Sequence, residues 1–96
     1  MRVGIAGYGV VGKKRYSSIV KNSSFKVTDI SEVNSIARKE IPDGINVFDN
    51  YQDLILQADL DVIFISLPNK YASDAVSLSL KTVSYTHLTL PTTVSV

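Results

Sequence analysis

The chain has no cysteine, no tryptophan and a single histidine among its 96 residues. Without cysteine it can form no disulfide, no zinc–thiolate centre and no thiol nucleophile. Ten basic residues nearly balance nine acidic ones, and a formal net charge of +1 gives no reason to expect a nucleic-acid or membrane partner. No apolar run approaches the roughly 20 residues of a membrane span, and we find no signal-peptide pattern. We therefore expect one small cytoplasmic domain.

Charged residues are also missing from the last fifteen positions, 82–96, although they are frequent up to Lys81. The only threonine in residues 1–81 is Thr28, whereas this last segment holds five. Its residues 83–92, VSYTHLTLPT, resemble the translation of a transposase adapter used in sequencing libraries. We therefore expect 1–81 to be a partial natural domain and 82–96 a non-native tail, either disordered or paired as a makeshift strand.

Two consequences follow from that interpretation of the tail. His87, the single histidine, would carry no chemical meaning, although histidine is otherwise the first candidate for acid–base chemistry. The natural protein would continue beyond Lys81 into other sequence. The alternative is a genuine threonine-rich strand that closes the sheet.

Glycine is scarce, with five residues in all, but three of them fall within six positions. They follow the short apolar segment Arg2–Ala6 and precede a helix-compatible segment. Gly7 permits a tight turn, Gly9 allows the backbone to approach phosphate oxygens, and Gly12 lets the helix pack on the strand. A pyrophosphate would then bind at the start of the helix. The predicted loop is Gly7, Tyr8, Gly9, Val10, Val11 and Gly12, and a purely structural glycine turn is the alternative.

The remaining sequence up to Lys81 alternates between strand and helix patterns. Four large apolar residues in succession, Val62 to Ile65, are typical of a parallel strand covered on both faces. The alternation predicts an α/β fold, an incomplete Rossmann-type doubly wound parallel sheet of about four strands. We expect strands at Arg2–Ala6, Phe25–Ser31, Ile45–Phe48 and Asp61–Leu67, with helices after Gly9 and at Val33–Glu40, Tyr51–Ala58 and Lys70–Leu80. In the first helix, Val10, Val11, Ile19 and Val20 are expected to face inward.

An acidic residue lies where such a fold meets the adenosine ribose. Glu32 comes twenty residues after Gly12, at the expected end of the second strand. Its carboxylate could accept hydrogen bonds from both ribose hydroxyls and would repel a 2′-phosphate, which favours NAD over NADP. Arg38 and Lys39 are close enough in sequence to leave NADP open. Asp29 competes for this role but should lie inside the strand, and an ordinary solvated carboxylate remains the alternative for Glu32.

The carboxyl end of the fourth predicted strand should also border a ligand. Ligands of open α/β sheets bind beyond the carboxyl ends of the strands. Ser66, Leu67, Pro68 and Asn69 occupy that position and should line the cofactor cleft. The simpler interpretation, in which Pro68 stops the strand and Asn69 caps the next helix, is compatible with it.

Taken together, these segments resemble the Gfo/Idh/MocA oxidoreductase family across residues 1–81. The resemblance rests on VGIAGYGVVGKKR, the acid at Glu32, NVFDNYQDLI and LDVIFISLPNKYASDAVSLSLK. It implies that Gly7 to Gly12 form the phosphate loop, that Glu32 binds ribose, and that Pro68 and Asn69 lie near the dinucleotide. It also implies a Glu-Lys-Pro motif and a second, substrate-binding domain in a longer protein.

The same resemblance implies hydride transfer between a nicotinamide and a sugar, cyclitol or related alcohol or carbonyl. The family's catalytic Lys and its acid–base His or Asp map to no residue of this chain, so we assign no catalytic residue and expect this fragment to be inactive. We expect no metal site. The longer protein would bind a small-molecule substrate and could be a homo-oligomer. The alternatives are a nucleotide-sensing regulatory Rossmann domain and the start of a semialdehyde or homoserine dehydrogenase.

Overall fold

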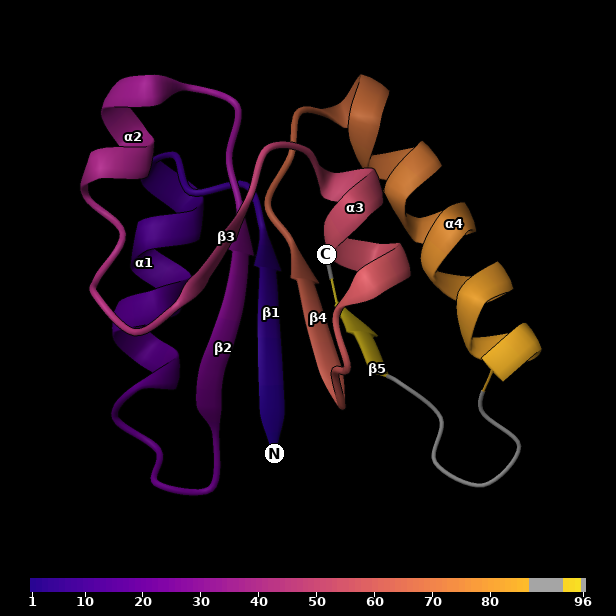
Figure 1. The fold of residues 1–96 in the computed structure, drawn as a ribbon, viewed down its shortest axis with the longest axis horizontal. Coiled ribbons are helices and arrows are strands. Elements are labelled where there is room, and N and C mark those ends of the chain that lie inside the picture. The colour runs from indigo at the N-terminus through magenta and orange to yellow at the C-terminus, as the bar shows by residue number, and fades with distance from the viewer. Residues whose placement is uncertain (87–92, 96) are drawn as a thin grey trace.

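A computed structural model describes the backbone of residues 1–86 and 93–95 and the side chains of residues 1–81. In this part of the chain, five parallel strands form one sheet in the order β3-β2-β1-β4-β5 (Figure 1). The strands are β1 (Arg2–Ala6), β2 (Lys26–Ser31), β3 (Asn46–Phe48), β4 (Val62–Ile65) and β5 (Thr93–Ser95). The helices are α1 (Val10–Ile19), α2 (Ser35–Lys39), α3 (Tyr51–Gln57) and α4 (Asn69–Thr86).

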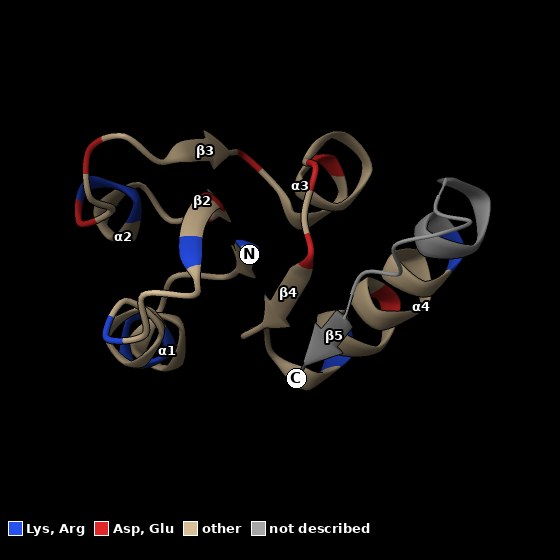
Figure 2. Ribbon diagram, turned by 90° about the horizontal axis from the view of Figure 1, so that it is seen from below, with Lys and Arg blue, Asp and Glu red and all other residues tan. Residues whose placement is uncertain are grey.

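The order of the strands confirms the doubly wound topology. β1 lies between β2 and β4, so the chain passes from β3 on one side of β1 to β4 on the other. α1 and α2 lie on one side of the sheet, and α3 and α4 lie on the opposite side (Figure 2). This is the arrangement that right-handed crossovers produce when the winding direction reverses.

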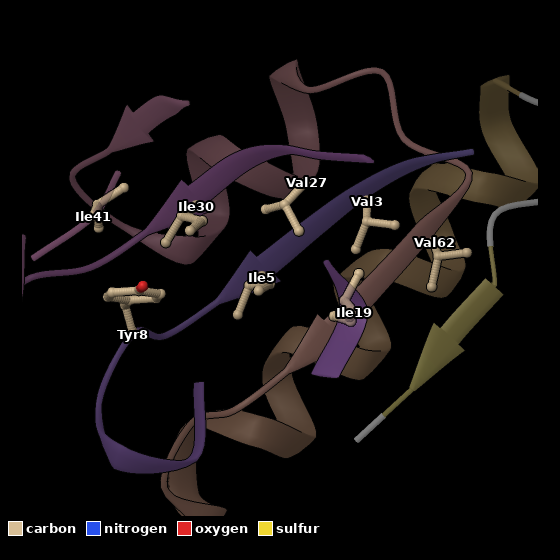
Figure 3. Packing of buried hydrophobic residues seen from close by; sticks show 8 residues of the cluster. All are labelled: Val3, Ile5, Tyr8, Ile19, Val27, Ile30, Ile41 and Val62. Carbon is tan, nitrogen blue, oxygen red and sulfur yellow. The ribbon is translucent and has the colours of Figure 1, made fainter. Parts of the chain in front are cut away.

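Side chains of the central strands alternate between two apolar layers. Val3 and Ile5 of β1 point into a cluster that includes Ile19 of α1 (Figure 3). Ala6 and the β4 residue Ile63 belong to the cluster on the other face, beneath α3 and α4. Both clusters are buried, which confirms that these parallel strands are covered on both faces.

A β-bulge interrupts the pairing of β1 with β2. Val3 is opposite Val27 but Gly4 is opposite Asp29, so Thr28 is an extra residue in β2. The extra residue changes the alternation, and as a result Val27 and Ile30 lie in the same apolar cluster. The Thr28 hydroxyl donates to the carboxylate of Asp29 over 2.5 Å, which satisfies a polar side chain within the sheet.

The prediction of which residues of the first helix face the sheet was wrong for three of the four residues. Val10, Val11 and Val20 are 71%, 53% and 49% exposed, and Ile19 is buried as predicted. Gly12 is the other buried residue of this helix, so the face toward the sheet includes a glycine seven residues before Ile19. The predicted packing of Gly12 against the strand is confirmed, and the three valines are exposed because this glycine side of the helix, rather than the valine side, lies against the sheet.

The carboxyl-terminal segment departs most from the predicted boundaries. α4 continues to Thr86 instead of ending at Leu80, and Thr93–Ser95 pairs in parallel with β4 as a fifth strand. A strand in the tail was one of the two arrangements expected for it. His87 lies outside the described residues.

The packing of Gly12 gives a direct test. A Cβ at this position would overlap the carbonyl oxygen of Gly7, which is backbone and cannot swing away. Alanine normally stabilises a helix relative to glycine, but Gly12→Ala should lower the free energy of unfolding by about 1–3 kcal/mol because of this overlap. Urea denaturation measures the change. Gly9→Ser is the control: its Cβ would meet nothing within 4 Å, and glycine and serine differ by only a few tenths of a kcal/mol at an N-cap. Equal urea midpoints for the two variants would show that the close contact at Gly12 does not limit the size of the residue there.

Candidate cofactor-binding site

A cavity of 740 Å³ opens where the carboxyl ends of β1, β2, β3 and β4 meet. This is the position at which open α/β sheets bind their ligands. Six of the eleven residues predicted from the sequence line this cavity, namely Gly7, Gly9, Glu32, Ser66, Leu67 and Pro68. The others, Tyr8, Val10, Val11, Gly12 and Asn69, are not among its lining residues.

Gly7 makes the turn that brings the chain off β1. Its φ of +98° lies in the left-handed region that favours glycine. A Cβ there would also come within 2.5 Å of the Ser66 carbonyl oxygen. The Gly7 amide donates to the Ser31 carbonyl over 2.9 Å, so the turn is fastened to the end of β2. The first glycine therefore has the role that the sequence predicts.

Gly9 and the first turn of α1 form an open cradle. No protein atom lies within 4 Å of the place that a Gly9 Cβ would occupy. Gly9 is the N-cap of α1, and no side chain caps this helix end. The amides of Val10, Val11 and Gly12 occupy the first three helical positions, which have no partner within a helix. These amides and the helix dipole suit an anion such as a pyrophosphate, so the valines contribute backbone rather than side chains.

Tyr8 also contributes to the site through its backbone. Its ring is 4% exposed and lies in the apolar cluster below the cavity, edge-on to Tyr16 at a centroid distance of 6.1 Å (Figure 3). Burial, followed by the nearby Tyr16, raises the pKa of the Tyr8 hydroxyl. The Tyr8 amide, in contrast, donates to Glu32 Oε1 over 2.6 Å.

Glu32 ties the end of β2 to the glycine loop. Its Oε1 accepts from the Tyr8 amide, and its Oε2 accepts from the Asn34 amide over 2.9 Å. A carboxylate offers about four acceptor positions, so two remain for the hydroxyls of a ribose. Asp29, the competing acid, lies within β2, is 3% exposed and accepts from Thr28 and Asn46. It does not line the cavity, so Glu32 is the carboxylate positioned for a ligand.

The end of β4 forms the opposite wall. The Ser66 amide donates to the Ala6 carbonyl over 2.8 Å, which extends the β1–β4 pairing by one residue. Ser66 Oγ is buried and has no hydrogen-bond partner in the described part of the chain. The Pro68 carbonyl accepts from the amides of Tyr71 and Ala72, and Asn69 is the first residue of α4 rather than the cap that precedes the helix.

Sequence reasoning missed several lining residues, among them Lys13, Tyr51 and Tyr71. The two tyrosine rings lie 6.4 Å apart at 51°, and Tyr51 donates through its hydroxyl to Asp74 Oδ2 over 2.5 Å. This hydrogen bond to Asp74 is the main cause that raises the pKa of Tyr51. The sequence feature that could have indicated Tyr51 is Asn50, the N-cap of α3. Its side chain accepts from the Asp53 amide, so the helix begins at Tyr51, just beyond β3.

The sequence also matches the model of a known protein family. Residues 1–88 match the model of the Gfo/Idh/MocA oxidoreductase family, described as having an NAD-binding Rossmann fold. The chain belongs to this oxidoreductase family. A search of curated proteins found no match.

Solved structures of dehydrogenases share the fold of this family member. Scyllo-inositol dehydrogenase from Lactobacillus casei, solved with NAD(H) and scyllo-inositol, matches 85% of the chain with 27% identity and a TM-score of 0.74. Myo-inositol 2-dehydrogenase from Lactobacillus plantarum shares the fold over 85% of the chain, with 22% identity and a TM-score of 0.78. Biliverdin reductase from Synechocystis, solved with biliverdin and NADP+, shares it over 84% of the chain, with 19% identity and a TM-score of 0.77. The chain spans 25%, 25% and 26% of these three proteins, respectively.

Among the described residues, no three or more His, Cys, Asp or Glu side chains gather as a metal site would require. Within residues 1–86 and 93–95, none of the helices combines the length and the hydropathy of a membrane span.

The contacts of Glu32 predict how its loss would affect the glycine loop. In Glu32→Ala, the Tyr8 and Asn34 amides lose a charged acceptor, and their hydrogen exchange should accelerate about tenfold or more. Glu32→Gln retains one carbonyl oxygen and should preserve the protection of one of the two amides. NMR-detected exchange measures both, with the Ser66 amide in the sheet as internal reference. Unchanged exchange at Tyr8 and Asn34 in Glu32→Ala would show that the carboxylate does not hold the loop.

Proposed function

We propose that this chain is the NAD(P)-binding portion of an oxidoreductase that transfers hydride to or from a sugar, cyclitol or related alcohol or carbonyl. The open cradle at Gly9 and the uncapped first turn of α1 carry this proposal, because they leave room and donors for a pyrophosphate. Membership of the family and the likeness to scyllo-inositol dehydrogenase support the class of substrate.

The residues of the cavity divide between the parts of a dinucleotide. Gly7 to Gly12 would hold the pyrophosphate through backbone amides, and Glu32 would accept hydrogen bonds from the adenosine ribose. Ser66, Pro68 and Asn69 at the end of β4 would border the dinucleotide on the other side of β1. The bound nicotinamide supplies or accepts the hydride, and the protein's share at this site is binding and orientation.

NAD is the cofactor that the local charge favours. The Glu32 carboxylate would lie beside the 2′ position of the ribose, where it accepts from a hydroxyl and repels a phosphate. Both kinds of dinucleotide occur among the similar structures, NAD(H) in scyllo-inositol dehydrogenase and NADP+ in biliverdin reductase.

The rest of the functional protein is also a proposal. Residues 1–81 would be the partial nucleotide-binding domain, residues 82–96 a non-native tail, and the natural continuation would supply the catalytic and substrate-binding groups. The chain spans about a quarter of its structural relatives, which supports a longer parent. That parent would be a cytoplasmic enzyme with a small-molecule substrate, and it could form a homo-oligomer.

Gly9→Val tests the cradle. The Gly9 backbone has φ of −77° and ψ of −157°, which valine can adopt, and the added side chain would enter open space rather than the core. The free energy of unfolding should therefore fall by no more than about 1 kcal/mol, because valine is a poorer N-cap residue than glycine. NAD affinity should fall at least about tenfold, equivalent to about 1.4 kcal/mol. Isothermal titration of the restored full-length protein measures the affinity. Ser17→Val, at an exposed position of α1, is the matched control. Undiminished NAD affinity in Gly9→Val would refute the proposed pyrophosphate site.

Deleting residues 82–96 tests the proposed tail. Every residue that lines the cavity precedes Ala72, so nucleotide affinity should be unchanged. The free energy of unfolding should change by no more than about 1 kcal/mol, as for changes outside a native core. Sequencing the source gene across codon 82 without transposase adapters provides the independent check. A loss of several kcal/mol on deletion, or recovery of the same codons, would show that the tail is native.

A further inference from the structure

Basic and acidic side chains form ion pairs near the end of the cavity where the ribose would bind. Basic residues gather on α1 and α2, which lie beside each other on one side of the sheet (Figure 2). Of the described residues that line the cavity, Lys13 is the one cation. It shares this lining with Glu32 and Asn34, the residues that follow β2, where the adenosine ribose would bind.

Ion pairs engage two of these cations, Lys13 and Arg38. The ammonium of Lys13 pairs with the carboxylate of Glu40, which directly follows α2 and does not line the cavity. Arg38, in the last turn of α2, pairs with Asp49 ahead of α3. The side chains of Lys13 and Glu40 are 38% and 50% exposed, so their pair is partly hydrated and each partner can be exchanged without opening the core.

We propose that Glu40 disfavours a 2′-phosphorylated dinucleotide by neutralising Lys13 at the ribose end of the cavity. This inference rests on the proposed dinucleotide function. With Glu40 in place, Lys13, Glu32 and Glu40 together carry one net negative charge, which opposes a phosphate at the 2′ position. Without Glu40, the ammonium of Lys13 loses its ion-pair partner and becomes a donor for that phosphate. Glu40 is therefore a positioning residue that sets cofactor specificity through Lys13.

Two small ligands isolate this effect. Adenosine 5′-monophosphate and adenosine 2′,5′-bisphosphate differ only in the 2′-phosphate, and both should occupy the adenosine half of the site. Their affinities for the 96-residue chain can be measured by NMR titration at low ionic strength, where surface charges are least screened. The variants are Glu40→Gln, Lys13→Gln and the double variant. Asp43→Asn is the control, because it removes one exposed carboxylate from the segment that follows Glu40.

Glu40→Gln should tighten binding of the bisphosphate about threefold to tenfold, the size of one partly exposed charge interaction. Affinity for the monophosphate should stay within about twofold. The gain should disappear in the double variant, and Asp43→Asn should not reproduce it.

Several outcomes would overturn the inference while leaving the proposed function in place. In the first, the chain binds the monophosphate but Glu40→Gln does not tighten binding of the bisphosphate. In the second, the tighter binding of the bisphosphate persists in the double variant, which lacks Lys13. In the third, Asp43→Asn tightens binding of the bisphosphate as much as Glu40→Gln does. If the unmodified chain binds neither ligand, the proposed function fails, and this inference fails with it.

Discussion

The contact between the backbone of Gly7 and the helix at Gly12 determines the geometry of the whole site. A side chain at either position would overlap backbone, the Ser66 carbonyl in one case and the Gly7 carbonyl in the other. Because both side chains are absent, β1 turns directly into α1, and the helix start lies over the end of the sheet. The position of the first turn of α1, which begins at Gly9 on the cavity lining, depends on this contact, and so does the burial of Ile19 farther along α1.

Glu32 connects this turn to the end of the second strand through hydrogen bonds of its carboxylate. The same carboxylate accepts from Tyr8 in the glycine loop and from Asn34 before α2. A group that would recognise ribose therefore also holds the loop that would recognise phosphate. One side chain therefore holds both the glycine loop and the segment before α2 at the edge of the cavity.

Local sequence patterns were sufficient for the elements and for part of the site. The apolar run of β4 predicted a strand covered on both faces, and the spacing from Gly12 predicted Glu32 as the acid beside the cavity. The bulge at Thr28 could not be predicted, because it depends on the pairing of β2 with β1 rather than on either strand alone. Tyr71 and Lys13 were missed for a similar reason, since their position at the cavity depends on how α4 and α1 lie over the sheet. The exposure of Val10 and Val11 followed from a glycine taking the inward position.

The pairing of β5 with β4 has a consequence for how gene boundaries are judged. Parallel pairing joins backbone groups, so it places few demands on the side chains of Thr93–Ser95. Many short extended segments could occupy the same edge. The β4 edge of this sheet can therefore be completed by a segment whose own sequence was not selected for that place. A neatly bordered sheet says little about where a natural coding sequence stops.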